Sequence, residues 1–511
     1  MKKTKKSTAR SFTGTAALMG IIILAAKVMG LLRDIMIAGN YGTTTAAIAY
    51  ETASKLPVTV FDLVLGGVVT SAFIPVYNSI SVKEGKKQAL AFAQSYFNFI
   101  LVITGVITVI GGVFAPQLVA FMAPELDAVS LALSAELTRI MFPMVIFCGA
   151  AFSFVGYLQS EGEYNIPAII SLVSNLIMVG YLLFLDRYFG VYGLAVSMLI
   201  GWGAQALVQL PSVRKRGFRF DFRAKLNTEP IRRAARNTLP ILVGTWTSPV
   251  CNLINTRLAS GIEGGRAITA LGYANRLYTI IVGVFSFVAT NLLFPYFSRA
   301  AASGDHDESN RLVRTSVKVL VFIIAPISVG IMMLAEPFTT LIYQRGDFTV
   351  EDTLLTAEAL GCYAVGMIFC AVNEVLTKAF FAAEKTKIPM ISAICSMVFN
   401  IVLITGFGER LGVGGIALVS GFAVMLNMAV NGMIARAKGI FAPTAGDFSD
   451  IAKSVISAVV MGAAVAWVYD LTAALGAVLS FGISVAAGVV VYAAAALILR
   501  SEEARMVVRR R

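Results

Sequence analysis

Four basic side chains lie inside stretches of sequence that are otherwise apolar enough to cross a lipid bilayer: Lys27, Arg33, Lys55 and Arg276. A cation at the centre of a membrane span costs about 2.5–3.5 kcal/mol on insertion scales. Such residues therefore usually face a water-filled cavity or a partner of opposite charge. The pattern predicts a cavity between membrane helices that receives a negatively charged ligand.

The composition places these cations in a membrane protein. Of 511 residues, 57% are hydrophobic and only 14% are charged, and the mean hydropathy is +0.79. Soluble domains contain about 25% charged residues. Apolar runs of about 20 residues, the length of a spanning helix, recur along the chain and predict an all-α polytopic protein with about fourteen spans. The predicted spans cover residues 13–38, 47–78, 89–114, 130–158, 165–186, 190–211, 238–259, 268–298, 313–335, 354–381, 388–407, 411–435, 451–470 and 475–499.

The distribution of Lys and Arg predicts the orientation of these spans. With the N-terminus inside, the outer loops contain few basic residues, namely Arg187, Arg266, Arg345 and Arg410. Because basic loops stay in the cytoplasm, we expect both termini there. The basic residues of the cytoplasmic segments account for most of the net charge of +13, so we expect no nucleic-acid partner.

The two halves of the sequence repeat at an offset of 222 residues. Ile166 matches Ile388, and the segment GVYGLA from Gly190 matches GVGGIA from Gly412. Repeats of six spans keep the same orientation and predict two pseudo-symmetric lobes, an architecture typical of transporters that rock about a central site.

The repeat divides the chain into four parts. The segment between the repeats is basic and contains Phe218, Phe220 and Phe222, a composition that suits an interfacial segment on anionic lipid. The predicted parts are an N-terminal lobe (1–212), this interfacial linker (213–237), a C-terminal lobe (238–436), and two further helices with a basic tail (437–511).

Several motifs resemble the MurJ (MviN) family of lipid II flippases. Residues 27–34 (KVMGLLRD) resemble its first helix, residues 71–76 (SAFIPV) its second, and residues 273–278 (YANRLY) its eighth. The resemblance covers most of the chain. It implies the six-plus-six-plus-two arrangement of the multidrug/oligosaccharidyl-lipid/polysaccharide exporter superfamily, in the plasma membrane of a bacterium.

The resemblance also implies a function, the export of undecaprenyl-diphosphate-linked peptidoglycan precursor from the inner to the outer leaflet. A diphosphate suits the cations, because guanidinium groups bind phosphate oxygens in pairs. Asp34 follows Arg33 as in the family and would orient that arginine. The predicted substrate-binding residues are Lys27, Arg33, Asp34, Lys55, Thr269 and Arg276. Expected partners are this lipid-linked glycan, membrane lipids and proteins of cell-wall synthesis.

A set of amides in the second half predicts a candidate sodium site. Asn252, Asn255 and Asn400 offer side-chain carbonyl oxygens, and some members of the resembled family are thought to bind sodium in this region. Hydrogen bonds between helices are the alternative interpretation, since no carboxylate accompanies the set. A sodium ion or the membrane potential would supply the driving force, and we expect no other cofactor.

Structural interpretations compete with the functional ones. Arg276 begins a long apolar run and could extend its charge to the membrane surface, and Lys55 could lie in a polar vestibule. Arg139 and Lys318 stand near predicted span ends and are interpreted as interface anchors.

Two departures from the family leave the substrate open. Lys27 replaces an arginine, and residues 48–50 (IAY) stand where the family has D-A-F. A teichoic-acid or capsular lipid-linked glycan therefore remains an alternative, as do a multidrug or cation antiporter that uses Glu51, Asp62 or Glu374, and a non-transporting scaffold. The sequence contains neither a Walker motif nor a nucleophile–base pair, so we expect transport rather than catalysis.

Overall fold

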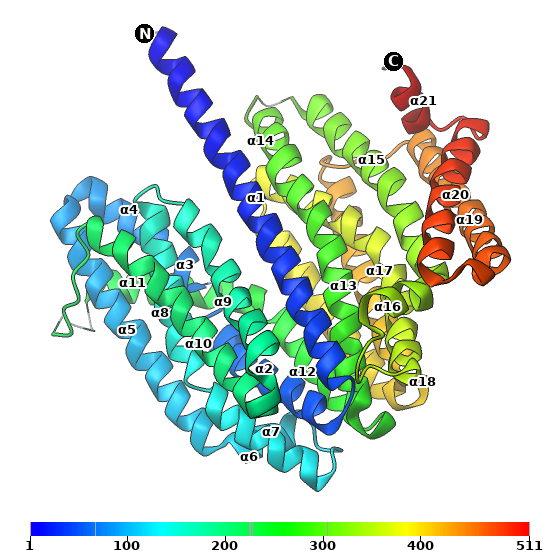
Figure 1. Cartoon of the computed structure of the whole chain (residues 1–511). Coiled ribbons are helices and arrows are strands. Elements are labelled where there is room, and N and C mark those ends of the chain that lie inside the picture. The colour runs from blue at the N-terminus through cyan, green and yellow to red at the C-terminus, as the bar shows by residue number, and fades with distance from the viewer. Residues whose placement is uncertain (1, 67, 224–225, 227, 304, 510–511) are drawn as a thin grey trace. The chain divides into compact units, whose positions relative to one another are not determined.

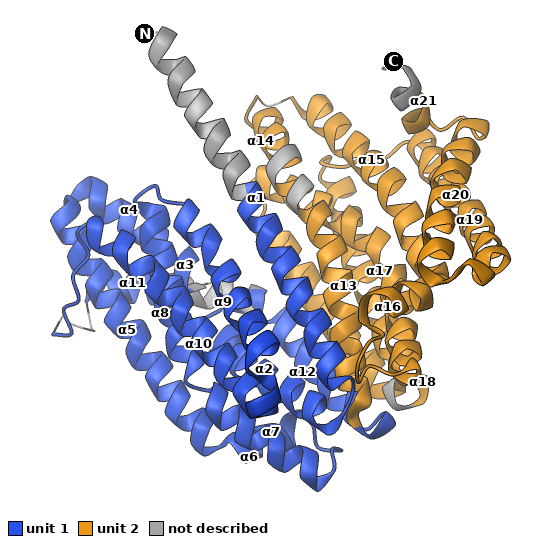
Figure 2. Cartoon of the chain, in the orientation of Figure 1, with its two compact units in different colours: residues 1–264 blue, residues 265–511 orange. Residues whose placement is uncertain are grey.

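The computed structural model describes residues 2–509 apart from residues 67, 224, 225, 227 and 304 (Figure 1). Every regular element in this part of the chain is a helix, which confirms the all-α prediction. Contacts divide the chain into two compact units, residues 1–264 and 265–511 (Figure 2). This division is based on contacts and does not coincide with the lobes predicted from the repeat, since residues 238–259 fall in the first unit. The lobe boundaries therefore stay a prediction.

Within the described residues, eleven helices are long and apolar enough to span a membrane, or twelve if a bent pair (Ala128–Met141 and Met144–Ser160) forms one span. The predicted spans 13–38 and 238–259 are helical but do not belong to this set. The protein is thus a polytopic helical membrane protein, while the number fourteen stays a prediction.

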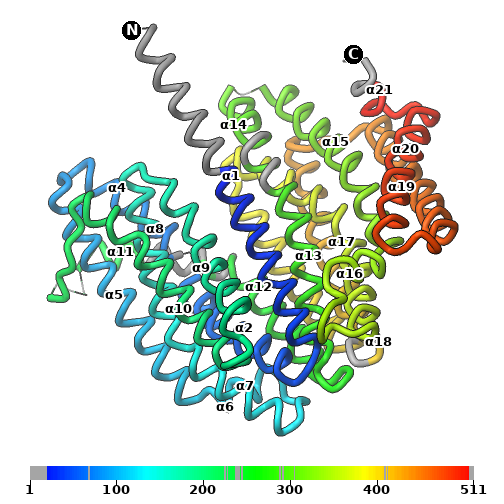
Figure 3. The backbone as a smooth tube through the Cα atoms, in the orientation of Figure 1, coloured from blue at the N-terminus to red at the C-terminus, as the bar shows by residue number. Residues whose placement is uncertain are grey.

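The first unit is a bundle in which α1 packs along α9, and α9 along α10 (Figure 3). Asp127 starts α7 because its carboxylate accepts a hydrogen bond from the backbone N–H of Ser130 at 2.5 Å, as helix N-caps do. The helices of this unit are α1 (Lys2–Tyr41), α2 (Thr45–Val64), α3 (Val68–Ser71), α4 (Phe73–Lys83), α5 (Lys86–Val113), α6 (Ala115–Met122), α7 (Ala128–Met141), α8 (Met144–Ser160), α9 (Asn165–Phe184), α10 (Asp186–Lys215), α11 (Glu229–Thr245) and α12 (Thr247–Ala259).

The basic linker is attached to the first unit by its aromatic side chains. Phe218 is buried and contacts the rings of Phe97 and Phe154 edge-on, at centroid distances of 5.8 and 6.1 Å. Phe222 is exposed. Phe218 was expected to lie on lipid with the other phenylalanines of the linker, but it packs into the protein core instead.

The second unit is a bundle around α15 and α17, with α19 and α20 packed together beside α15. Apolar side chains of α15 and α17, among them Val317, Ile324, Met367 and Val375, form its core. Its elements are α13 (Arg266–Val288), the π-helix η2 (Ala289–Leu293), α14 (Phe294–Ser303), α15 (His306–Met333), α16 (Ala335–Tyr343), α17 (Val350–Ala382), α18 (Lys387–Ala437), α19 (Ala445–Thr472), η3 (Ala473–Leu475), α20 (Ala477–Ile498) and α21 (Glu502–Arg509), and the short η1 (Glu263–Gly265) lies at the junction of the two units.

The repeat seen in the sequence recurs in the backbone. Gly190 interrupts α10 with φ 51° and ψ −144°, and Gly412 interrupts α18 with φ 64° and ψ −164°. Only glycine adopts such angles without strain. In both halves a short helix that contains proline, α6 or α16, directly follows a long one. Equivalent sequence positions thus make equivalent local structure.

Candidate substrate-binding residues

Arg33 is held by two side chains of the first unit. Its Nε and Nη2 donate to Oδ1 of Asp34 at 3.0 and 2.8 Å, and its Nη1 donates to Oδ1 of Asn175 at 2.9 Å. The Arg33 side chain is 26% exposed and that of Asp34 is 6% exposed. Three of the five guanidinium N–H groups are therefore engaged. The charge of Arg33 is compensated, and two N–H groups remain for a ligand.

Arg33 and Asn175 line a pocket of about 460 Å³ between α1, α8, α9 and α10. The lining combines apolar and aromatic side chains with amides and hydroxyls. Such mixtures are typical of small-molecule sites, in which a few polar groups orient the ligand. Its residues are Arg33, Phe152, Pro167, Ile170, Ser171, Ser174, Asn175, Met178, Met198, Trp202 and Gln205.

Lys27 and Arg33 lie on different faces of α1. Six residues at about 100° each place the two side chains about 120° apart, whereas Asp34, seven residues from Lys27, shares its face. Lys27 is half-buried, and among the described residues it forms no ion pair. Within residues 20–41 of α1, Lys27 is therefore a cation whose charge no carboxylate of the described residues compensates.

Lys55 is paired within its own helix. Its Nζ lies 3.1 Å from Oε1 of Glu51, one turn earlier on α2, and the Glu51 side chain is buried. A ligand anion would have to compete with that carboxylate for Lys55.

In the second unit, Arg276 is half-buried on α13 with its guanidinium carbon 5.5 Å from the ring centroid of Tyr273. Tyr273 is buried against Tyr343, so this contact rests on a fixed aromatic surface. Thr269 is also buried, and its hydroxyl donates to the backbone carbonyl of Arg266 at 2.8 Å. In the structure the Thr269 hydroxyl is thus engaged in a hydrogen bond within its own helix.

The amides predicted to bind sodium belong to both units. Asn252 is exposed on α12 and Asn255 is half-buried there. Asn400 on α18 is only 2% exposed, and its Oδ1 has no hydrogen-bond partner among the described residues. A buried amide oxygen without a donor fits a cation ligand chemically.

Two buried amides of the pocket were not predicted from the sequence. Asn175 and Gln205 are buried on α9 and α10. The signal was present, since each is an amide within an apolar span. Of the predicted residues, the structure brings Arg33 and Asp34 into direct contact, and Asn175 completes that group.

Residues 37–487 match the family model described as lipid II flippase MurJ. The chain belongs to the MurJ family. This confirms the resemblance drawn from the sequence motifs. The match begins after Lys27, Arg33 and Asp34, and it includes Lys55 and Arg276.

Curated relatives agree with the MurJ assignment. The probable lipid II flippase MurJ of Rhizobium meliloti (strain 1021) is 29% identical over 410 residues, which cover 78% of this chain and 76% of the relative. The lipid II flippase MurJ of Burkholderia cenocepacia (strain ATCC BAA-245 / DSM 16553 / LMG 16656 / NCTC 13227 / J2315 / CF5610) is 24% identical over 456 residues, or 87% of each chain.

Solved structures show the same fold. A lipid II flippase MurJ in an inward closed conformation aligns with a TM-score of 0.82 at 22% identity, over 96% of this chain and all of the other. An inward-facing multidrug resistance MATE family transporter aligns with a TM-score of 0.70 at 15% identity, over 83% of this chain and 98% of the other. The MurJ-family chain therefore has the fold of these transporters.

Proposed function

We propose that this protein moves lipid II, the polyprenyl-diphosphate-linked precursor of peptidoglycan, from the inner to the outer leaflet of a bacterial plasma membrane. The names of its MurJ relatives support this function. The observation that carries it is Arg33, a guanidinium at the wall of a polar pocket inside a bundle of apolar helices. The Arg33–Asp34 pair is neutral, and an anionic ligand would bind the two guanidinium N–H groups that remain.

The diphosphate would be bound by exchange of partners at Arg33. Two N–H groups of Arg33 are available at once, and a phosphate oxygen can replace Asp34 on the other two. Lys27 would add a positive charge to the same part of α1, because the Arg33–Asp34 pair is neutral. Arg276 of the second unit is a further candidate for binding an anion by its motif, and its guanidinium lies over the ring of Tyr273.

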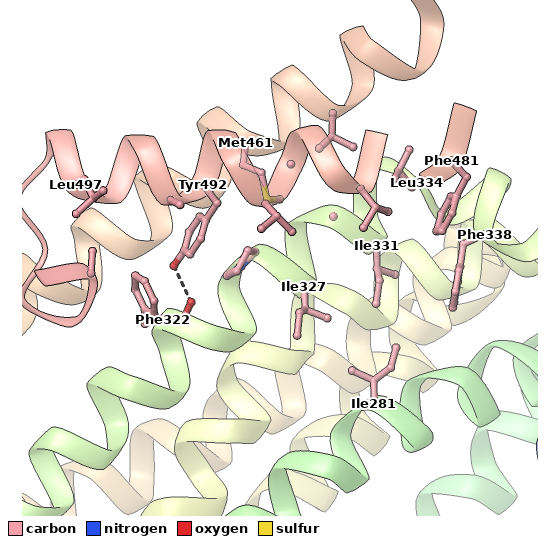
Figure 4. Close-up of a pocket in the computed structure, with 18 residues that line it drawn as sticks. Ile281, Phe322, Ile327, Ile331, Leu334, Phe338, Met461, Phe481, Tyr492 and Leu497 are labelled. Atoms are coloured by element: carbon pink, nitrogen blue, oxygen red, sulfur yellow. Dashed lines mark hydrogen bonds between the residues drawn. The ribbon is translucent and has the colours of Figure 1, made fainter. Parts of the chain in front are cut away.

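The polyprenyl chain would lie in an apolar groove of the second unit. This groove has a volume of about 580 Å³ and lies between α15, α19 and α20 (Figure 4). Phe322, Ile331, Met461 and Leu497 contribute apolar wall, and the Tyr492 hydroxyl is occupied by the backbone carbonyl of Phe322 at 2.6 Å. A surface of this kind suits a hydrocarbon chain, because it offers few competing polar groups.

The driving force would be the membrane potential or a sodium ion. Export of an anion from a negative interior gains about 2.3 kcal/mol per charge per 100 mV. Asn400 supports a cation ligand in the second unit, because its buried oxygen has no hydrogen-bond donor among the described residues. Both termini would lie in the cytoplasm, and the protein would act as a transporter without catalytic chemistry.

A multidrug or cation antiporter is less well supported. That mechanism needs a carboxylate in the membrane that exchanges protons or sodium. Glu51 is paired with Lys55 at 3.1 Å. Glu374 accepts a hydrogen bond from Ser286 at 2.9 Å and lies 3.6 Å from Lys378. Both carboxylates are thus already engaged within the protein, whereas Asp62, the third candidate, is half-buried without an ion pair among the described residues and is the carboxylate that an antiporter would have to use.

Depletion of the protein in its own cell tests the proposal. We expect lipid II to accumulate on the cytoplasmic leaflet, which a leaflet-selective probe of lipid-linked precursors would measure. Complementation should fail with Lys27→Ala, Arg33→Ala and Arg276→Ala, and should succeed with the control Arg187→Ala, since Arg187 is exposed. Accumulation of a teichoic-acid precursor alone would replace lipid II as the substrate, and full complementation by all three variants would indicate a scaffold.

A further inference from the structure

We propose that Asn175 is a positioning residue that aims the Arg33 guanidinium at the ligand, an inference that rests on the proposed function. A single amide group of α9 bridges two points on α1. Its Oδ1 accepts from Nη1 of Arg33 at 2.9 Å, and its Nδ2 donates to the backbone carbonyl of Ala26 at 3.1 Å. Ala26 and Arg33 are seven residues apart and therefore lie on one face of α1.

The two hydrogen bonds fix the amide in one orientation. Only the oxygen can accept from Arg33, and only the nitrogen can donate to the carbonyl of Ala26. Asn175 is 5% exposed, and a buried polar group that loses its hydrogen-bond partner is unfavourable. Rotation of the amide by 180° would break both contacts at once. Arg33 thus has a rigid acceptor on one side and Asp34 on the other.

Gly30 provides the space for this amide. It stands between Ala26 and Arg33 on the same face of α1, and a Cβ added at Gly30 would lie 3.3 Å from Nδ2 of Asn175. That distance is shorter than ordinary van der Waals contact. A side chain at this position would push the amide away from α1 and would shift Arg33 with it.

The consequence for binding is geometric. A guanidinium binds a phosphate group well only when its N–H groups point at the phosphate oxygens. Asn175 holds Nη1 and Asp34 holds Nε and Nη2, which leaves two N–H groups of Arg33 for a ligand in the pocket that Arg33 and Asn175 line.

Affinity measurements on the purified full-length protein test this role. Native mass spectrometry with lipid II should show that Asn175→Leu weakens binding about tenfold. The matched control is Asn98→Leu. Asn98 is a buried amide of the same unit that donates to the carbonyl of Asp221 at 2.7 Å and does not contact Arg33. We expect this control to lose thermal stability as Asn175→Leu does, with less than a twofold change in affinity.

Two further variants separate positioning from folding. Gly30→Ala removes no polar group and should still weaken binding about threefold, at nearly unchanged thermal stability. In an Arg33→Lys background, Asn175→Leu should have almost no additional effect, because the guanidinium that it positions is gone. Equal losses in both backgrounds, or an Asn175→Leu protein that binds like wild type, would overturn the inference.

The choice of probe keeps this test separate from the proposed function. The same double-mutant cycle is run with undecaprenyl diphosphate, which has the diphosphate but no glycan. Wild-type protein that binds this probe and not lipid II would reject the proposed substrate. The cycle with undecaprenyl diphosphate would then still report whether Asn175 acts on a diphosphate through Arg33. If the effects of the Asn175 and Arg33 substitutions are independent for both probes, the role of Asn175 is rejected and the proposed function is not affected.

Discussion

Arg33 and Asp34, neighbours in the sequence, form a charge-neutral pair at the wall of the pocket in the first unit. Two N–H groups of the guanidinium meet one carboxylate oxygen at 3.0 and 2.8 Å. A ligand anion must therefore displace a carboxylate to use the whole face of Arg33. We therefore expect the pair to influence both the affinity for the anion and the rate of its release.

Asp34→Asn removes this competing charge. We expect several-fold tighter binding of undecaprenyl diphosphate, because the guanidinium keeps its full charge for the ligand. Thermal stability should fall, since a partly buried cation loses its partner. Titration of the purified protein measures the affinity. The control is Asp186→Asn, which alters a carboxylate hydrogen-bonded to Tyr41 and Asn40. Equal affinity of the wild type and both variants for the diphosphate would show that it does not reach Arg33.

Ala493→Phe fills part of the apolar groove. Ala493 lines this groove on α20, whereas its neighbour Ala494 is exposed and does not line it. We expect Ala493→Phe to weaken binding of a lipid with a long polyprenyl chain by about tenfold. Binding of a short-chain analogue with the same head group should not change. The Ala494→Phe variant should bind both lipids with wild-type affinity. If Ala493→Phe weakens binding of the long-chain and the short-chain lipid equally, the polyprenyl chain does not bind in this groove.

Glu161 should make the stability of the first unit depend on pH. Burial alone would raise the pKa of Glu161, but hydrogen bonds from Lys86 at 2.6 Å and from Tyr77 at 2.7 Å lower it below the ordinary value of 4.5. Because the folded pKa is lowered, the stabilisation is complete above the unfolded value and is lost as pH falls through the folded pKa.

Glu161→Gln measures this contribution. The variant should be about 1 kcal/mol less stable at neutral pH, and its stability should approach that of wild type as pH falls below 4.5. Thermal unfolding across this pH range provides the measurement. Glu84→Gln serves as the control, since Glu84 is exposed and forms no ion pair among the described residues. A difference that does not shrink on acidification would contradict the assigned role.

Lys318 ties the C-terminal segment to the second unit. It is 9% exposed and lies 3.5, 3.4 and 3.9 Å from carboxylate oxygens of Asp447, Asp450 and Glu503, and it also pairs with Glu502. Its interpretation as an interface anchor was therefore wrong, since the ammonium lies among carboxylates inside the protein. Lys318→Met should leave these charges uncompensated, at a cost of about 3 kcal/mol, and release α21.

Hydrogen exchange in residues 502–509 measures that release, and we expect faster exchange in Lys318→Met than in wild type. Ala504 of α21 lines the apolar groove, so lipid affinity should fall in parallel. Lys453→Met removes a more exposed partner of Asp450 and should leave the exchange of α21 nearly unchanged. Identical exchange in all three proteins would exclude Lys318 as the attachment.

The sequence by itself determined the class of protein and much of its local structure. Apolar run length decides which segments can span a bilayer, because every buried backbone group needs an internal hydrogen bond. The 222-residue offset paired Gly190 with Gly412, and in the structure both glycines interrupt their helices with similar angles. The motif with Arg33 and Asp34 also identified a real contact, since adjacent residues can meet without any tertiary information.

The tertiary structure alone decided which distant groups act on those cations. Asn175 meets Arg33 across 142 residues of sequence, and helical periodicity within one span carries no information about the partner helix. The same holds for Lys318 and Glu502, which are 184 residues apart. Packing selects such contacts through the shape and desolvation of facing helices, which a single sequence does not encode locally.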